Sequence, residues 1–259
     1  MIKIAFFDID GTLLSFRTHA MSASTVRALD TMRRNGVRTV ICTGRAAIEL
    51  PPELVGDAFD AFDAYVTVGG QRCFCGGDAY RDVTLDPSDV AVIVEQVLEG
   101  RYDVLVMLGD REFVSALSPR VLALSEQVKI TYEADDIRLA LENPVYQFCA
   151  FLDPADEQQF LCRMKSTITT RWTPLCCDVI PARGGKDYGV RATLDYFGLS
   201  PEEAVGFGDG ENDLPMFRAV GTKVAMGNAN EAVKADADLV TDDVDSDGIW
   251  NACRGLGLV

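Results

Sequence analysis

The stretch that decides the fold is Ile2-Lys3-Ile4-Ala5-Phe6-Phe7-Asp8-Ile9-Asp10-Gly11-Thr12-Leu13-Leu14. A mostly apolar run leads directly into two acids, Asp8 and Asp10, and then into Gly11, which lets the chain turn at once. This pattern predicts a buried strand that delivers both carboxylates to the carboxyl edge of a sheet, where open α/β sheets bind ligands. Two acids this close repel each other unless a cation lies between them or one holds a proton. Both arrangements suit phosphoryl chemistry, as a hard-metal site or as a nucleophile beside a general acid.

Length and charge limit the classes of protein that the chain can belong to. The 259 residues are 48% hydrophobic, which is enough for one large domain or two modest ones. The net charge of -16 argues against non-specific binding of nucleic acid, which needs clustered Lys and Arg. No apolar run is long enough to span a membrane, so we expect no membrane partner. Asp8 and Asp10 interrupt the first apolar stretch before any cleavage site, which argues against a signal peptide and predicts a cytoplasmic protein.

The cysteine and histidine residues of the sequence do not form a zinc-binding motif. The chain has eight cysteines but no Cys-x-x-Cys, and His19 is its one histidine. A zinc site is therefore not expected. Most of the cysteines lie in apolar, strand-like runs and are predicted to be reduced core residues.

The chain begins with the alternation of strands and helices that is typical of a doubly wound parallel sheet. Residues 2–7, 37–42 and 64–68 read as strands, and residues 22–35 read as a helix with Ser22 as its cap. The same rhythm returns near the end, with a helix predicted at residues 186–197 that Gly198 ends, and further strands at residues 204–207, 223–226 and 239–240.

Between these two parts the pattern changes, and no carboxylate motif follows a strand. We predict an inserted α+β domain at residues 81–182, within a core domain formed by residues 1–80 and 183–259. Its expected helices lie at residues 88–98, 119–127 and 155–167, and its expected strands include residues 102–108 and 145–152. The fold class is therefore α/β, a doubly wound parallel sheet with an inserted α+β domain.

Four polar motifs occur in a fixed order along the predicted core. The first is the apolar strand ending in Asp-x-Asp-Gly-Thr, and the second is an apolar strand ending in Thr43-Gly44-Arg45. The third is Lys186 at the start of a helix, and the fourth is Gly-Asp-x-x-Asn-Asp at residues 208–213. This set resembles the haloacid dehalogenase-like superfamily of phosphatases. The inserted domain between the second and third motifs resembles the C2B cap of the Cof-type subgroup.

The resemblance assigns the catalytic and metal-binding roles. It implies that Asp8 is the nucleophile and forms an aspartyl-phosphate, and that Asp10 is the general acid and base. It also implies a Mg²⁺ cofactor held by the Asp8 carboxylate, the backbone carbonyl of Asp10 and the Asp209 carboxylate, with Asp213 supporting these ligands or reaching the metal through water.

The same resemblance implies the residues that bind the substrate's phosphate. Thr43, with nearby amides such as that of Gly44, would bind phosphoryl oxygens, and Lys186 would neutralise the phosphate and the Asp8 charge. Asn212 would bind phosphate or orient Asp209, while Arg45, read from the sequence alone, either reaches the substrate or begins a helix. The subgroup often has Asn-Gly after its third strand, whereas this chain has Val68-Gly69, so a polar contact in the phosphate pocket is either missing or supplied by another residue.

These features predict a Mg²⁺-dependent phosphatase acting on a small phosphorylated metabolite, most simply a sugar phosphate, as a monomer or homodimer. Alternatives are a phosphatase for a nucleotide or a flavin or pyridoxal cofactor, and a sugar phosphomutase, which uses the same first motif. A phospho-accepting receiver domain is a rival from another class, but its acceptor Asp lies on a later strand and it lacks an inserted cap. A binding protein of the same fold that has lost catalysis is disfavoured by the intact motifs.

Overall fold

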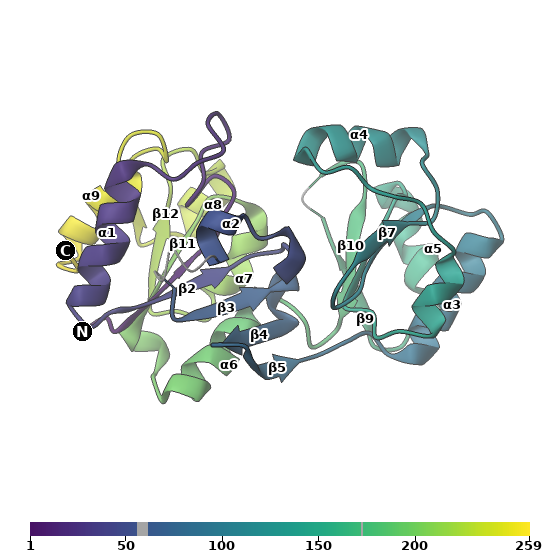
Figure 1. Ribbon diagram of the computed structural model, residues 1–259, viewed down its shortest axis with the longest axis horizontal. Coiled ribbons are helices and arrows are strands. Elements are labelled where there is room, and N and C mark those ends of the chain that lie inside the picture. The colour runs from purple at the N-terminus through teal and green to yellow at the C-terminus, as the bar shows by residue number, and fades with distance from the viewer. Residues whose placement is uncertain (56–61, 172) are drawn as a thin grey trace. The chain divides into compact units, whose positions relative to one another are not determined.

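The computed structural model divides the chain into two compact units, which are described separately (Figure 1). The core unit comprises Met1–Arg45, Glu49–Asp82 and Gly185–Val259, and the inserted unit comprises Ala46–Ile48 and Val83–Gly184. The structure describes residues 1–55, 62–171 and 173–259.

The core unit contains a sheet whose strands lie in the order β13-β12-β11-β1-β2-β3-β4-β5. The six strands from β13 to β3 run parallel, which confirms the predicted doubly wound α/β sheet. In the centre, Phe7 of β1 is level with Phe207 of β11 and with Ile41 of β2, so these three strands end at the same edge. The parallel strands are β1 (Ile4–Phe7), β2 (Arg38–Cys42), β3 (Ala64–Thr67), β11 (Ala204–Gly208), β12 (Thr222–Ala225) and β13 (Leu239–Val240).

Two antiparallel strands, β4 (Arg72–Cys75) and β5 (Asp78–Asp82), extend one side of this sheet and were not expected from the sequence. They form a hairpin whose turn is Gly76-Gly77, with φ values of 56° and 95°. Glycine adopts such positive φ angles without steric cost. The strands are short and carry charged residues, so the alternation of apolar and polar residues that predicts a strand is weak here.

The sheet of the core unit is covered on both faces because successive side chains of its strands point to opposite sides. In β1, Ala5 and Phe7 pack with helix α1 (Ala23–Arg34) and helix α9 (Gly248–Gly255). Ile4 and Phe6 pack in the other cluster, which includes residues of α6 (Lys186–Phe197), α7 (Leu214–Phe217) and α8 (Glu231–Asp236). The central strand is therefore fully buried, as its apolar sequence predicts.

Two helix ends follow the predicted capping chemistry. The Ser22 side chain accepts a hydrogen bond from the backbone N–H of Thr25 and begins α1. Gly198 ends α6 in the left-handed conformation, with φ of 66°. The remaining short helices of this unit are α2 (Pro52–Val55), η2 (Val68–Gly70), η5 (Pro201–Glu203) and η6 (Glu211–Asp213).

The inserted unit contains an antiparallel sheet in the order β7-β6-β8-β10-β9, with helices packed on one face. Its strands are β6 (Val104–Met107), β7 (Glu112–Val114), β8 (Gln147–Ala150), β9 (Thr167–Thr170) and β10 (Cys177–Pro181). Its helices are α3 (Pro87–Leu98), α4 (Pro119–Val128), η3 (Ile137–Leu141), η4 (Pro154–Asp156) and α5 (Glu157–Leu161), while η1 (Ala47–Glu49) lies at the boundary with the core unit.

The predicted helix at residues 155–167 is wrong over its second half. Helix α5 ends at Leu161, and Thr167 already begins strand β9. The side chain of Asp89 in α3 accepts hydrogen bonds from the backbone N–H groups of Lys165 and Ser166 and from the Thr167 hydroxyl, at 3.0, 2.9 and 2.7 Å. These contacts from a distant helix hold the segment in a non-helical conformation.

All eight cysteines are free thiols, and six of them are buried, in agreement with the predicted reduced core residues. In the part of the chain that the structure describes, no helix has the length and apolarity needed to cross a membrane.

Candidate active site

The first, second and fourth motifs meet at the carboxyl edge of the core sheet. Asp8 follows β1, Thr43 follows β2, and Asp209 follows β11, the strand that pairs with β1. Asp8 is 5% exposed and Thr43 is 2% exposed, so both lie below the surface of this edge. The parallel register brings these positions together although they are far apart in the sequence.

Lys186 joins this group from the first residue of α6. Its Nζ atom lies 2.5 Å from Oδ1 of Asp8 and 2.6 Å from Oδ1 of Asp213. Lys186 is 3% exposed and Asp213 is fully buried, so the three charges are held away from water. Burial alone would lower the pKa of Lys186, but the two carboxylates overcome this effect and raise it. The lysine is therefore a fixed cation.

Glycines allow α6 to approach the sheet closely enough to place Lys186. A Cβ atom at Gly70 would lie 2.1 Å from the carbonyl oxygen of Gly185. A Cβ atom at Gly189 would lie 2.4 Å from Cγ1 of Val66 and 2.8 Å from Cα of Gly70. Because real Cβ atoms do not fit at such distances, the start of α6 can pack against the end of β3 only if these positions are glycine.

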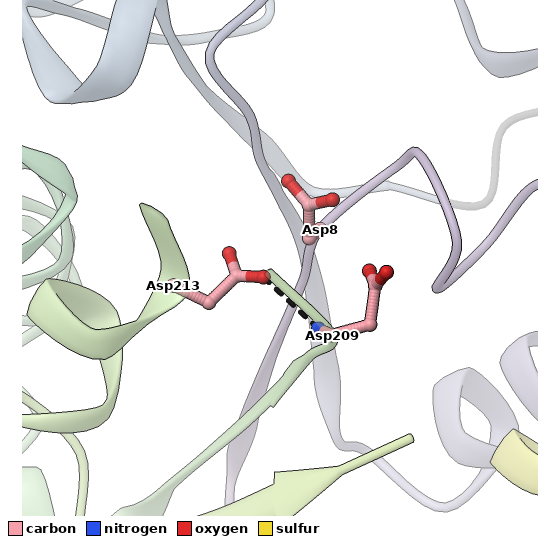
Figure 2. A group of neighbouring side chains, drawn as sticks. All are labelled: Asp8, Asp209 and Asp213. Carbon is pink, nitrogen blue, oxygen red and sulfur yellow. Dashed lines mark hydrogen bonds between the residues drawn. The ribbon is translucent and has the colours of Figure 1, made fainter. Parts of the chain in front are cut away.

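Three carboxylates form a compact group at the ends of β1 and β11 (Figure 2). One oxygen from each of Asp8, Asp209 and Asp213 lies within 4.8 Å of the others. Asp213 already accepts three hydrogen bonds. Its Oδ2 atom accepts from the backbone N–H groups of Asp209 and Gly210, at 3.0 and 3.1 Å, and its Oδ1 atom accepts from Nζ of Lys186. Asp8 and Asp209 therefore have more oxygen lone pairs left for a further ligand.

The electrostatics of this group favour an additional cation. Burial, together with the charge of Asp213, raises the pKa of Asp8 well above its ordinary value, although Lys186 acts in the opposite sense. Burial and Asp213 likewise raise the pKa of Asp209 to about 7. One lysine does not balance three carboxylates, of which Asp8 and Asp213 are buried and Asp209 is half-buried. An all-oxygen donor set with excess negative charge fits a hard divalent cation, so these residues could hold a metal ion such as Mg²⁺.

Asp10 and Arg45 form a bidentate ion pair. Arg45 Nε donates to one oxygen of Asp10 at 2.8 Å, and Arg45 Nη2 donates to the other at 2.6 Å. A third donor, Nη1, binds the carbonyl oxygen of Glu49 at 3.1 Å. Arg45 was expected to reach the substrate, but here its guanidinium is committed to Asp10. This geometry fixes the orientation of the Asp10 carboxylate.

The other predicted phosphate contacts lie after two strands of the core sheet. Thr43 and Gly44 follow β2, and Asn212 lies in η6 after β11. The Thr43 hydroxyl accepts a hydrogen bond from the backbone N–H of Arg45 at 3.1 Å, and Gly44 is the residue between the two. Asn212 is exposed in η6. Val68 is buried and has φ of 48°, a left-handed conformation that is unusual for a β-branched residue and is better tolerated by Asn.

Two residues at the site were missed by the sequence analysis. The Thr12 hydroxyl donates to Oδ1 of Asp209 at 3.0 Å. The side chain of Asn228 donates to the carbonyl oxygen of Gly11 at 2.8 Å and lies 3.5 Å from Oδ2 of Asp209. Thr12 belongs to the first motif and was visible there, whereas Asn228 lies in a turn with no distinguishing pattern.

Comparison with known proteins agrees with this geometry. A family model of haloacid dehalogenase-like hydrolases matches residues 5–253. The phosphatase BT1666 of Bacteroides thetaiotaomicron is 35% identical, with a TM-score of 0.91 over 100% of this chain and 96% of that one. The subclass IIB sugar phosphatase BT4131 is 30% identical, with a TM-score of 0.88 over 99% of this chain and 100% of that one. The HMP-PP phosphatase of Citrobacter koseri is 27% identical over 88% of this chain and 85% of that protein.

These matches confirm the predicted Cof-type resemblance. The match of the family model over nearly the whole chain, on a fold that gathers all four motifs at one sheet edge, establishes the family. The chain therefore belongs to the haloacid dehalogenase-like hydrolase family, in which it is a phosphoric monoester hydrolase.

Proposed function

We propose that the chain is a Mg²⁺-dependent phosphatase that hydrolyses small phosphomonoesters through an aspartyl-phosphate on Asp8. The observation that carries the proposal is the position of Asp8, whose carboxylate is paired with the buried ammonium of Lys186 at 2.5 Å and grouped with Asp209. A nucleophile that attacks a phosphate dianion needs positive charge around it. Lys186 supplies one fixed positive charge at that point.

The residues of the chain support a two-step reaction. In the first step an oxygen of Asp8 forms a bond to phosphorus while the bond from phosphorus to the leaving oxygen breaks, and Asp10 gives its proton to that oxygen. In the second step Asp10 takes a proton from water, whose oxygen attacks the phosphorus and releases phosphate and free Asp8. Arg45 binds both oxygens of Asp10, so one of these two hydrogen bonds must open before Asp10 can carry the proton that it donates, while the other keeps the group in position.

The metal ligands that we propose are the carboxylates of Asp8 and Asp209 and the backbone carbonyl of Asp10. Asp213, whose oxygens already accept three hydrogen bonds, supports Asp209 and Lys186 rather than binding the ion directly. When bound, Mg²⁺ would offset the repulsion between the carboxylates and stabilise negative charge on the transferring phosphoryl group. Thr43, the Gly44 amide and Asn212 remain the proposed phosphate contacts.

A sugar phosphate is the proposed substrate class, supported by the 30% identity to a sugar phosphatase over nearly the full length. The likeness to HMP-PP phosphatase keeps a cofactor-related phosphate as the second candidate. We further propose that the inserted unit, predicted at residues 81–182, acts as the cap that selects the leaving group. A cytoplasmic location and a monomeric or homodimeric state stay predictions.

The proposal is tested by measuring phosphate release from sugar phosphates, HMP-PP, nucleotides and flavin and pyridoxal phosphates, with Mg²⁺ and with EDTA. We expect release from the wild type that EDTA abolishes and that Asp8→Asn lacks. Retained turnover in Asp8→Asn would remove the nucleophile assignment. Interconversion of sugar phosphates without free phosphate would identify a phosphomutase instead.

A further inference from the structure

Asn228 lies in the turn between β12 and α8 and makes three polar contacts with its side chain. Its Nδ2 atom donates to the carbonyl oxygen of Gly11 at 2.8 Å and approaches Oδ2 of Asp209 at 3.5 Å. Its Oδ1 atom accepts the backbone N–H of Val244 at 2.9 Å. The carbonyl of Gly11 can only accept and the N–H of Val244 can only donate, so the amide orientation is fixed by its partners.

The backbone of the turn around Asn228 is hydrogen-bonded to Asp242 on one side and to Asp209 on the other. Gly227 donates its N–H to the carbonyl oxygen of Asp242 at 3.0 Å, and a Cβ atom at Gly227 would lie 2.5 Å from the backbone nitrogen of Asp243. On the other side, the N–H of Asn230 donates to the carbonyl oxygen of Asp209 at 3.3 Å. The turn therefore has little freedom to carry Asn228 away from Asp209.

Asp209 depends on few groups for the orientation of its carboxylate. The Thr12 hydroxyl donates to Oδ1 of Asp209, and the side-chain amide of Asn228 lies beside Oδ2. Gly11 also matters, because a Cβ atom there would lie 2.2 Å from Oδ2 of Asp209. Asn228 binds the carbonyl of Gly11 and so fixes the chain segment that lies against this oxygen.

We infer that Asn228 is a positioning residue for the metal site. Its side chain links the backbone at Val244 to Gly11 and Asp209. Rather than binding the ion, it holds the Asp209 carboxylate and the loop after Asp8 in the arrangement that a divalent cation needs. This inference rests on the proposed function for the identity of the cation. Residues that orient metal ligands commonly change metal affinity by about 10–100-fold when they are replaced.

The test is a calorimetric titration of EDTA-treated full-length protein with Mg²⁺, for the wild type and for Asn228→Ala. We expect the Kd for Mg²⁺ to rise by about 10–100-fold in Asn228→Ala. The Mg²⁺ concentration that half-activates phosphate release should rise in parallel, with most of kcat recovered at saturating Mg²⁺. A merely structural role would lower the unfolding midpoint without shifting the Mg²⁺ dependence.

Asn251→Ala is the matched control, because Asn251 donates to Asp242 at 2.8 Å from an exposed position and is not bonded to Gly11 or Asp209. It should bind Mg²⁺ as the wild type does. If Asn228→Ala does not fold, Asn228→Ser is used, since its hydroxyl is one bond shorter than the amide and should show the same loss.

The outcomes separate this inference from the proposed function. An unchanged Kd for Mg²⁺ in a folded Asn228 variant overturns the inference alone. Absence of Mg²⁺ binding by the wild type overturns both the inference and the proposed metal dependence. Turnover by Asp8→Asn overturns the proposed nucleophile but leaves the role of Asn228 in metal binding standing.

Discussion

The Nζ atom of Lys186 lies 2.5 Å from Oδ1 of Asp8, although 178 residues separate them in the chain. Both side chains are almost fully buried, and the same ammonium also binds Asp213 at 2.6 Å. A buried ion pair is strongly destabilised when one partner is removed, because the other charge is left without compensation. Lys186 therefore has a structural role beside its proposed catalytic one.

Lys186→Met should lower the free energy of unfolding by about 3–5 kcal/mol in the absence of Mg²⁺, because Asp8 and Asp213 would lose their shared cation. Urea unfolding monitored by circular dichroism measures the change. Lys3→Met is the control, since the Lys3 side chain is 56% exposed where it pairs with Glu203 at 2.6 Å, and it should change stability by no more than about 1 kcal/mol. Equal stability of both variants would contradict the account.

Gly189→Ala should destabilise the core unit by about 1–3 kcal/mol, because the new methyl group would collide with Val66 and with the backbone of Gly70. The displacement of α6 should also reduce phosphate release by moving Lys186. Gly255→Ala, at the end of helix α9, meets open space and should leave stability unchanged or raise it slightly. Thermal melting and phosphate-release assays on the two variants make the comparison, and a harmless Gly189→Ala would disprove the packing argument.

Arg45→Lys should lower kcat on the order of 10²-fold with little change in KM, because the bidentate hold on Asp10 would be lost and catalytic groups are sensitive to small displacements. Steady-state kinetics decides between this role and direct substrate binding. A raised KM with unchanged kcat would show that Arg45 binds the substrate, as the sequence suggested. Arg38→Lys, which alters a partly exposed pair with Asp63, is the control.

Asp89 provides a test of pH dependence in the inserted unit. Burial alone would raise its pKa, but hydrogen bonds from Thr167, Ser166 and Lys165 outweigh burial and lower it. A lowered folded-state pKa means that the ionised group stabilises the fold above the unfolded pKa of about 3.9 and loses this contribution as pH falls through the folded value. Asp89→Asn should therefore cost about 1.5–3 kcal/mol at pH 7 and progressively less below about pH 4.

Urea unfolding of wild type and Asp89→Asn at a series of pH values measures this trend. Asp153→Asn is the control, because Asp153 pairs with Arg120 at 2.7 Å on the surface. It should have a small effect at every pH. A difference between wild type and Asp89→Asn that stays constant down to pH 3 would contradict the assignment of the lowered pKa.

Much of the core and the site could be predicted because the signals are local. The helix over residues 186–197 was predicted with its observed bounds, since Gly198 ends it in a left-handed conformation. Asp8, Thr43 and Asp209 were placed together because each follows a strand of one parallel sheet, and parallel strands end at a common edge.

The remainder depends on contacts between distant segments. The sequence pattern predicts a helix up to residue 167, but hydrogen bonds to Asp89 hold Lys165 and Thr167 in a non-helical conformation. Arg45 has the residue type of a phosphate ligand, and only the folded structure reveals its pairing with Asp10. Asn228 sits in a turn sequence that carries no sign of its contact with Gly11, 217 residues away.

The central claim, that Asp8 is the nucleophile, is tested most directly by trapping the phosphoenzyme. The full-length protein is mixed with Mg²⁺ and the best substrate from the panel, quenched in acid during turnover, and analysed by peptide mass spectrometry. The account predicts phosphate on the peptide that contains Asp8 in the wild type and none in Asp8→Asn. Phosphate on another residue, or steady turnover by Asp8→Asn, would contradict it.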